Sequence, residues 1–222
     1  MKKIVFSGWL ILFCAHMVLA QDRIEAPNLS VGNKWVSTDG TTMAVIGVDE
    51  NSYKIKREWK PGISSPWETF QSETLWLERS TLNRINPVQG KKPRAYKGAQ
   101  RRLLNFPLTI GKSWKDNYMT QLTWEDERTE LPGGHSVGEE TQIFESYKVL
   151  GWEDVEVRAG HFRAMKIEYK RDWSYPTTGI REGKAWYWYC PEVKNFVKLQ
   201  YDTSQIWSQS HDTELASFSL TE

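Results

Sequence analysis

Residues 162–171 read FRAMKIEYKR, a stretch in which apolar side chains recur at every second position. In a β-strand, Met165, Ile167 and Tyr169 would share one face of a sheet. A helix would instead repeat its apolar positions every three or four residues, which this stretch does not do. With Gly160 in the turn before it, the segment predicts a β-strand that follows a hairpin turn.

The same alternation extends over most of the chain, and Gly, Pro, Asn or Asp interrupt it at intervals of about ten residues, as in antiparallel strands joined by turns. We predict an all-β fold, a single curved antiparallel sheet or half-barrel with at most one short helix; only residues 74–82 are ambiguous. Residues 86–100 are predicted to be a loop, and the last strand is predicted to close the edge of the sheet. The predicted strands are 33–38, 41–48, 53–59, 73–79, 81–85, 118–127, 140–157, 162–171, 185–190, 196–201 and 215–220.

Two short segments resemble each other. Residues 31–35 read VGNKW and residues 110–114 read IGKSW. The pattern fits two β sub-sheets, each opened by a glycine turn and a buried tryptophan.

The first twenty residues predict export. Lys2 and Lys3 precede an apolar run that ends in small residues before Gln21, as in a secretory signal peptide. An uncleaved anchor and lipid attachment at Cys14 are the alternatives, but the bulky Phe13 argues against the latter. We expect a signal peptide at 1–20, then one antiparallel β domain at 21–222 in the periplasm or secreted, with no integral membrane span after processing.

Composition narrows the function classes. The formal net charge is +1 over 222 residues, which gives no reason to expect a nucleic-acid partner. After processing, Cys190 is the single cysteine, so the monomer has no internal disulfide. The chain contains 12 tryptophans, which predicts a core rich in aromatic rings.

No motif predicts catalysis, a cofactor or a metal site. His135, His161 and His211 are too far apart in sequence for a local metal motif, and Cys190 is expected to be an inert buried thiol. Acidic doublets such as Glu153-Asp154 point to opposite faces of a strand, so they cannot both address one glycosidic bond. The sequence therefore predicts no catalytic residues.

The run Trp186-Tyr187-Trp188-Tyr189 is the strongest candidate for a ligand site. Trp186 and Trp188 should lie on one face of a strand and Tyr187 on the other, and Tyr169 on the 162–171 strand could join it. One interpretation is a central strand covered on both faces. The other is an aromatic wall of a concave pocket for an apolar or sugar ligand.

A basic run is the second candidate. Six cations occur without an acid between positions 91 and 102, which is typical of a solvated loop and also of a contact with an anionic envelope component. These candidate residues for anionic-surface contact are Lys91, Lys92, Arg94, Lys97, Arg101 and Arg102.

Residues 151–168, GWEDVEVRAGHFRAMKIE, and 185–198, AWYWYCPEVKNFVK, resemble a group of exported bacterial β-proteins of unknown function. In that group a valine, an alanine-glycine turn and a phenylalanine precede a strand, and a tyrosine-tryptophan-tyrosine, proline-glutamate-valine hairpin precedes a closing strand. Residues 106–114 are similar to a further segment, and Arg158 stands where the pattern usually has proline. The resemblance implies a curved antiparallel sheet or half-barrel and supplies no catalytic residues.

Three functions remain open. The first is an exported binding or carrier protein for a small molecule of unknown identity, with an apolar molecule as one candidate. The second is an envelope assembly or structural factor without a small-molecule ligand, and the third is a carbohydrate-active or other envelope hydrolase, which would need carboxylates to converge in a cleft. The sequence does not identify the ligand, the partner or the oligomeric state.

Overall fold

The computed structural model describes residues 23–59, 72–85, 96–98, 102–121, 140–175, 179–202 and 212–221. No helix occurs in these residues, and accordingly none of them forms a helix that could cross a bilayer. The strands, in chain order, are β1 (Arg23–Ile24), β2 (Lys34–Ser37), β3 (Thr42–Val48), β4 (Ser52–Glu58), β5 (Ser72–Glu78), β6 (Arg84–Ile85), β7 (Tyr96–Gly98), β8 (Leu108–Thr109), β9 (Ser113–Gln121), β10 (Glu140–Val157), β11 (Gly160–Tyr175), β12 (Gly179–Cys190), β13 (Asn195–Tyr201) and β14 (Thr213–Ser219).

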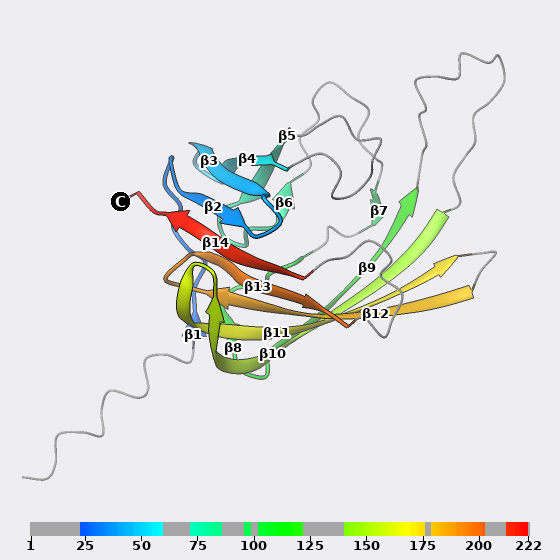
Figure 1. The fold of residues 1–222 in the computed structure, drawn as a ribbon. Helices are drawn as coiled ribbons and strands as arrows, with labels where there is room; N and C mark the ends of the chain where they lie inside the picture. The colour runs from blue at the N-terminus through cyan, green and yellow to red at the C-terminus, as the bar shows by residue number, and fades with distance from the viewer. Residues whose placement is uncertain are drawn as a thin grey trace, which may run out of the picture.

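One large antiparallel sheet dominates the fold. It has 12 strands in the order β6-β5-β4-β3-β2-β14-β13-β12-β11-β10-β9-β7, and β1 pairs with β8 in a separate two-stranded sheet. The large sheet is not closed into a barrel, because β6 and β7 are its two ends. Figure 1 shows the red strand β14 between the blue and cyan strands β2–β5 and the green to orange strands β9–β13.

The predicted fold class is confirmed. The structure is all-β and its main element is a single antiparallel sheet that does not close. The strand predicted at 140–157 has those bounds in β10, and β2, β3 and β4 form the predicted meander. The ambiguous segment 74–82 belongs to strand β5 and the turn after it.

Two details of the predicted topology are wrong. The strand predicted to close an edge is β14, which instead lies between β13 and β2. The predicted loop 86–100 contains β7, which pairs with β9 at one end of the sheet. Alternation reports that a segment is a strand, but it carries no information about which distant strand it pairs with.

The similarity between residues 31–35 and 110–114 corresponds to two equivalent turns. Gly32 and Gly111 both have positive φ, 95° and 83°, a conformation that favours glycine. The N–H of Gly32 donates to the carbonyl of Val45, and the N–H of Gly111 donates to that of Val149, at 2.9 Å in both cases. The turn before β2 is thus hydrogen-bonded to β3, and the turn before β9 is hydrogen-bonded to β10.

Each glycine turn leads into a buried tryptophan. Trp35 is 4% exposed and Trp114 is 6% exposed. The indole Nε1 of Trp35 donates to the carbonyl of Val193, and that of Trp114 donates to the carbonyl of Arg102, both at 2.8 Å. The predicted pair of sub-sheets, each opened by a glycine turn and a buried tryptophan, is confirmed.

The repeat continues beyond the turns. Lys54 on β4 lies opposite Trp76 on β5, and Lys166 on β11 lies opposite Trp188 on β12. Each ammonium lies over the indole ring, at 5.1 Å and 4.8 Å from its centroid. We call β2–β6 the N-terminal half and β9–β13 the C-terminal half; β14 joins them.

Strand β12 is buried on both faces. Trp188 and Cys190 belong to a first core that also contains Trp35 and other residues of the N-terminal half. Tyr187 and Tyr189 belong to a second core, which includes Leu108 of β8. The C-terminal half therefore packs one face on the N-terminal half, while its other face is covered by short segments of chain.

The two halves offer a matched test of a backbone constraint. Register shifts at Gly151 in β10 and at Gly47 in β3 mark equivalent bulges, but only Gly151 has a positive φ, 151°. Gly151→Ala should reduce the free energy of unfolding by about 1–3 kcal/mol, because a side chain is strained in that conformation. Gly47→Ala should cost less, because its Cβ would make an ordinary 3.4 Å contact with Lys54.

Urea denaturation of both variants measures the difference. An equal loss of stability in the two variants would contradict the assigned backbone conformation at Gly151.

Candidate ligand-binding site

A row of aromatic rings crosses the second-core face of β9–β13. Trp114 stacks on Tyr147 with ring centroids 5.0 Å apart, and Tyr147 contacts Tyr169 at 5.1 Å. Tyr169 in turn contacts Tyr187, and Tyr187 contacts Phe196, at 5.5 Å each. These side chains meet because they alternate to the same face on neighbouring strands.

A buried carboxylate holds one end of this row. Glu145 is 2% exposed and accepts hydrogen bonds from the hydroxyls of Tyr169 at 2.6 Å, Tyr147 at 2.8 Å and Tyr118 at 3.0 Å. The Nε of Arg171 lies 3.8 Å from the carboxylate. Hydrogen bonds and a nearby cation compensate the cost of burying the charge, so this cluster is built to fix the tyrosine rings.

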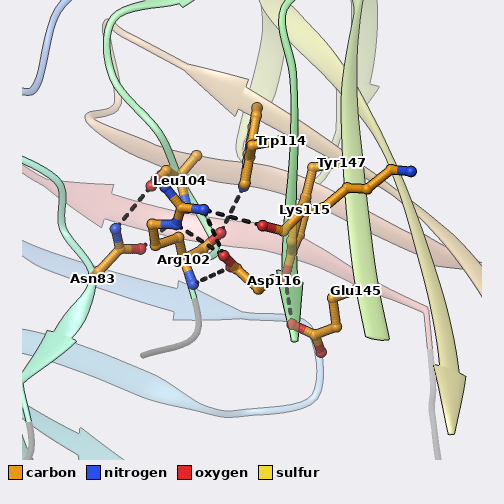
Figure 2. A network of polar contacts seen from close by, with 8 residues as sticks. All are labelled: Asn83, Arg102, Leu104, Trp114, Lys115, Asp116, Glu145 and Tyr147. Carbon is orange, nitrogen blue, oxygen red and sulfur yellow. Dashed lines mark hydrogen bonds and ion pairs between the residues drawn. The ribbon is translucent and has the colours of Figure 1, made fainter. Parts of the chain in front are cut away.

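A second buried acid, Asp116, lies opposite Glu145 in the β9–β10 register. It accepts from the backbone N–H of Arg102 at 2.7 Å and from its Nε at 2.8 Å, as Figure 2 shows. The Arg102 guanidinium also donates to the carbonyl of Lys115. Both carboxylates are engaged by donors of the protein itself, and neither is presented to a substrate.

Residues 102–107 cover the aromatic row, and a residue of the N-terminal half also binds them. Asn83 donates to the carbonyl of Leu104 at 2.9 Å and accepts from its N–H at 3.3 Å (Figure 2). Sequence reasoning missed Asn83, Asp116 and Glu145 as organising residues. For Glu145 a signal was available, because the acid shares the alternating face of Ile143 and Tyr147.

Two of the six predicted basic contact residues lie within the described residues. Arg102 is used internally by Asp116, although its side chain remains 47% exposed. Lys97 lies in edge strand β7. The other four, Lys91, Lys92, Arg94 and Arg101, fall outside the described residues.

The four predicted ligand-site aromatics lie on two faces. Tyr169 and Tyr187 belong to the aromatic row, and both are buried. Trp188 lies on the opposite face, in the first core, where it is 3% exposed; Trp186 packs against the same core. The structure therefore does not bring these four side chains together around one common space.

The Trp188 indole makes polar contacts with side chains of neighbouring strands. Its Nε1 donates to the Glu153 carboxylate at 3.0 Å, and Lys166 binds that carboxylate at 2.9 Å. The hydrogen bond from Lys166 is the main reason that the pKa of Glu153 lies below its usual value. These contacts support a packing role for Trp188.

An open cavity lies elsewhere, where β1 and the turn between β12 and β13 meet. Its volume is about 290 Å³. Its aromatic and apolar lining residues are Ile24, Pro27, Trp152, Tyr189 and Pro191, and its charged lining residues are Arg23, Glu25 and Lys194. An apolar wall with a few polar groups is the usual composition of a small-molecule site.

Tyr189 is the most informative residue of this cavity. Tyr189 is 1% exposed, and its buried hydroxyl has no hydrogen-bond partner among the residues that the structure describes. Burial raises the pKa of Tyr189, so the phenol stays protonated and can donate. Phe106 and Phe196 pack edge-on against the ring at 5.5 Å and 5.8 Å and fix its position.

The charged residues at the cavity differ in how they are paired. The Nε of Arg23 contacts the Glu25 carboxylate, and both side chains are well exposed. Lys194 donates from Nζ to the carbonyl of Asn28 at 2.7 Å. Lys194 lies in the turn between β12 and β13 and has a left-handed backbone conformation, with φ 58°.

The N-terminal half has a different set of side chains at the equivalent corner. Leu77 and Leu82 occupy the positions of Tyr189 and Lys194, and both pack against the first core. Leu82 also has a left-handed backbone, with φ 56°. Leucines thus close the corner that in the C-terminal half carries a phenol, an ammonium and a cavity.

In the part of the chain that the structure describes, no three His, Cys, Asp or Glu side chains are grouped so that they could hold a metal ion. Cys190 is fully buried in the first core, and burial raises the pKa of its thiol. A buried thiol with a raised pKa is a poor nucleophile.

Comparisons with known proteins do not assign a family. No protein-family model and no curated protein matches this chain. A predicted lipoprotein from Parabacteroides distasonis ATCC 8503 superposes with a TM-score of 0.44 at 13% identity, covering 90% of this chain and 100% of that one. A predicted exported protein with a YmcC-like fold from Bacteroides fragilis NCTC 9343 gives a TM-score of 0.42 at 15% identity, covering 89% and 99%. Similarity at this level does not establish a common function or location.

Removing the Tyr189 hydroxyl should stabilise the protein in the absence of ligand. Tyr189→Phe deletes a buried donor that has no partner, so the free energy of unfolding should rise by about 1 kcal/mol. The matched control is Tyr169→Phe, which removes a hydrogen bond to the buried Glu145 carboxylate and should lower stability by about 1.5–3 kcal/mol. Thermal and urea denaturation of the ligand-free variants measure both changes. A loss of stability in Tyr189→Phe would show that the hydroxyl already has a partner.

Proposed function

We propose that this protein is an exported binding or carrier protein that holds a small molecule in the cavity between β1 and the β12–β13 turn. The observation that carries the proposal is the cavity itself, whose lining combines apolar and aromatic side chains with a few charged ones.

The size of the cavity suits this role. At about 290 Å³ it is close to the lower end of small-molecule sites, which span about 300–1,000 Å³. The wall that Trp152 and the prolines form would bury the apolar part of such a ligand. Aromatic rings fixed by neighbouring strands lose little entropy on binding.

Export is supported by the sequence of residues 1–20, which lie outside the described residues. A basic start, an apolar run and small residues before Gln21 are typical of a secretory signal. The proposed location is the periplasm or the exterior of the cell.

Native mass spectrometry of the processed protein purified from its own envelope tests the proposal. We expect an additional mass of a small molecule on the wild-type protein, and its loss in Trp152→Ala, which removes the aromatic wall. Val48→Ala, at the equivalent bulge position of the N-terminal half, is the matched control and should keep the adduct. A wild-type protein without adduct, or an adduct that survives in Trp152→Ala, would refute a ligand in this cavity.

An alternative function is envelope assembly through a protein partner. It is favoured by β7, which ends the sheet with one edge unpaired among the described strands and belongs to the basic run 91–102. A free strand edge can accept a strand of another protein. Photocrosslinking from Tyr96 in cells should then give one consistent protein adduct, whereas the absence of any adduct would count against this function.

A further inference from the structure

We infer that a band of lysines on the first-core face of β9–β12 docks an acidic segment of a partner protein that also carries apolar side chains. The band consists of two neighbouring rows of the sheet, and its lysines are Lys115, Lys148, Lys170 and Lys184. The cavity residues Trp152 and Tyr189 belong to the second core, on the other face of the sheet. The docking surface is therefore separate from the cavity and goes beyond the proposed function.

The first row crosses four strands. Lys115 on β9 lies opposite Ser146 on β10, and Ser146 lies opposite Lys170 on β11. Lys170 in turn lies opposite Lys184 on β12. Side chains of directly opposed residues point to the same face of a sheet. The first row therefore places three ammonium groups on one face.

The second row shows which face this is. Lys148 on β10 lies opposite Glu168 on β11, and Glu168 lies opposite Trp186 on β12. Trp186 packs against the first core, and Lys184, two residues before it, points to the same side. Figure 1 shows β9–β12 extending beyond β2–β6. The band thus lies beside the N-terminal half, and three of its four lysines are exposed.

The band carries an excess of positive charge. Its one carboxylate, Glu168, is shared by two lysines, at 2.6 Å from Lys184 and 3.5 Å from Lys170. Lys115 and Lys148 form no ion pair with any residue that the structure describes. Four ammonium groups and one carboxylate give the band a charge of +3, which attracts an anionic partner.

Two exposed apolar side chains flank the lysines. Phe144 is 42% exposed and lies in the next row, where Asp172 and Glu182 end the positive band. Leu150 is 40% exposed and follows Val149, which belongs to the second core. Alternation directs Leu150 to the opposite face, toward the band. A partner for this surface therefore needs apolar groups as well as anionic ones.

An acidic protein segment fits these features better than a membrane or a polysaccharide does. The N-terminal half packs on the same face, and packed sheets lie about 10 Å apart, so it keeps a flat bilayer away from the band. An acidic polysaccharide offers carboxylates but has no apolar side chains to cover Phe144 and Leu150. A polypeptide segment supplies both kinds of group.

Fluorescence anisotropy with three labelled probes tests the inference on the processed protein. The probes are a peptide of Glu-Glu-Leu repeats, an oligoglutamate of the same length and an oligogalacturonate of the same charge. We expect the Glu-Glu-Leu peptide to bind about fivefold more tightly than either of the others, because apolar contacts add to the attraction between charges. Added salt should weaken the binding of all three probes.

Single substitutions locate the binding surface. Lys148→Gln should weaken the Glu-Glu-Leu peptide about fivefold, because it removes one exposed cation of the band. Lys34→Gln removes an equally exposed lysine from β2 in the N-terminal half and is the matched control, so it should leave the affinity unchanged. Leu150→Gln should reduce the affinity of the Glu-Glu-Leu peptide to that of oligoglutamate.

The inference is overturned if the Glu-Glu-Leu peptide does not bind, or if Lys34→Gln weakens it as much as Lys148→Gln. Equal binding of oligoglutamate would contradict the apolar contacts, and equal or tighter binding of oligogalacturonate would assign the surface to a polysaccharide instead. The small-molecule adduct plays no part in this test, so the docking surface and the cavity can each fail without the other.

Discussion

The fold depends on a requirement to bury both faces of β11 and β12. Successive side chains of a strand point to opposite sides, so Trp188 and Tyr187 must be covered by different parts of the molecule. The N-terminal half covers one side. The other is covered by β1, β8 and residues 102–107, which Asp116 and Asn83 hold through hydrogen bonds.

The position of β14 has the same origin. A continuous sheet lets the two halves bend toward each other, and β14 supplies the connecting ladder between β13 and β2. Its pairing with β2 joins residues near opposite ends of the described chain. Such contacts close long loops, and no local pattern in residues 213–219 identifies them.

Period-two alternation was sufficient to predict the class and most strands, because half-buried strands impose it directly. The similarity of residues 31–35 and 110–114 correctly indicated two equivalent turns. The bulge at Gly151 was not predicted, although it changes which side chains of β10 face which core: Val149 belongs to the second core and Val155 to the first. A bulge is decided by the register of two strands together, which one segment does not reveal.

The candidate site was less accessible to sequence reasoning than the fold. The tryptophan and tyrosine run was identified, but Tyr187 and Trp188 lie in dense cores, and the cavity involves Tyr189 with residues from three separate segments. One of these is the start of β1, and another is Trp152 just after the bulge. A site assembled from an N-terminal strand, a bulge and a turn has no common sequence spacing. Trp152 and Tyr189 lie on either side of Met165 in the sheet, and the pairing of β1 with β8 positions the N-terminal strand.

The different surroundings of the two halves explain why the cavity lies in the C-terminal half. The apolar face of the N-terminal half is closed by a complete sheet, the first-core side of β10–β13, and its corner is sealed by Leu77 and Leu82. Among the described residues, the equivalent face of the C-terminal half is covered by short stretches of chain, β1, β8 and residues 102–107, and not by a second large sheet. A gap at the end of β12 is the geometric consequence. Tyr189 and Lys194 line that gap, where the N-terminal half has leucines that pack against the first core.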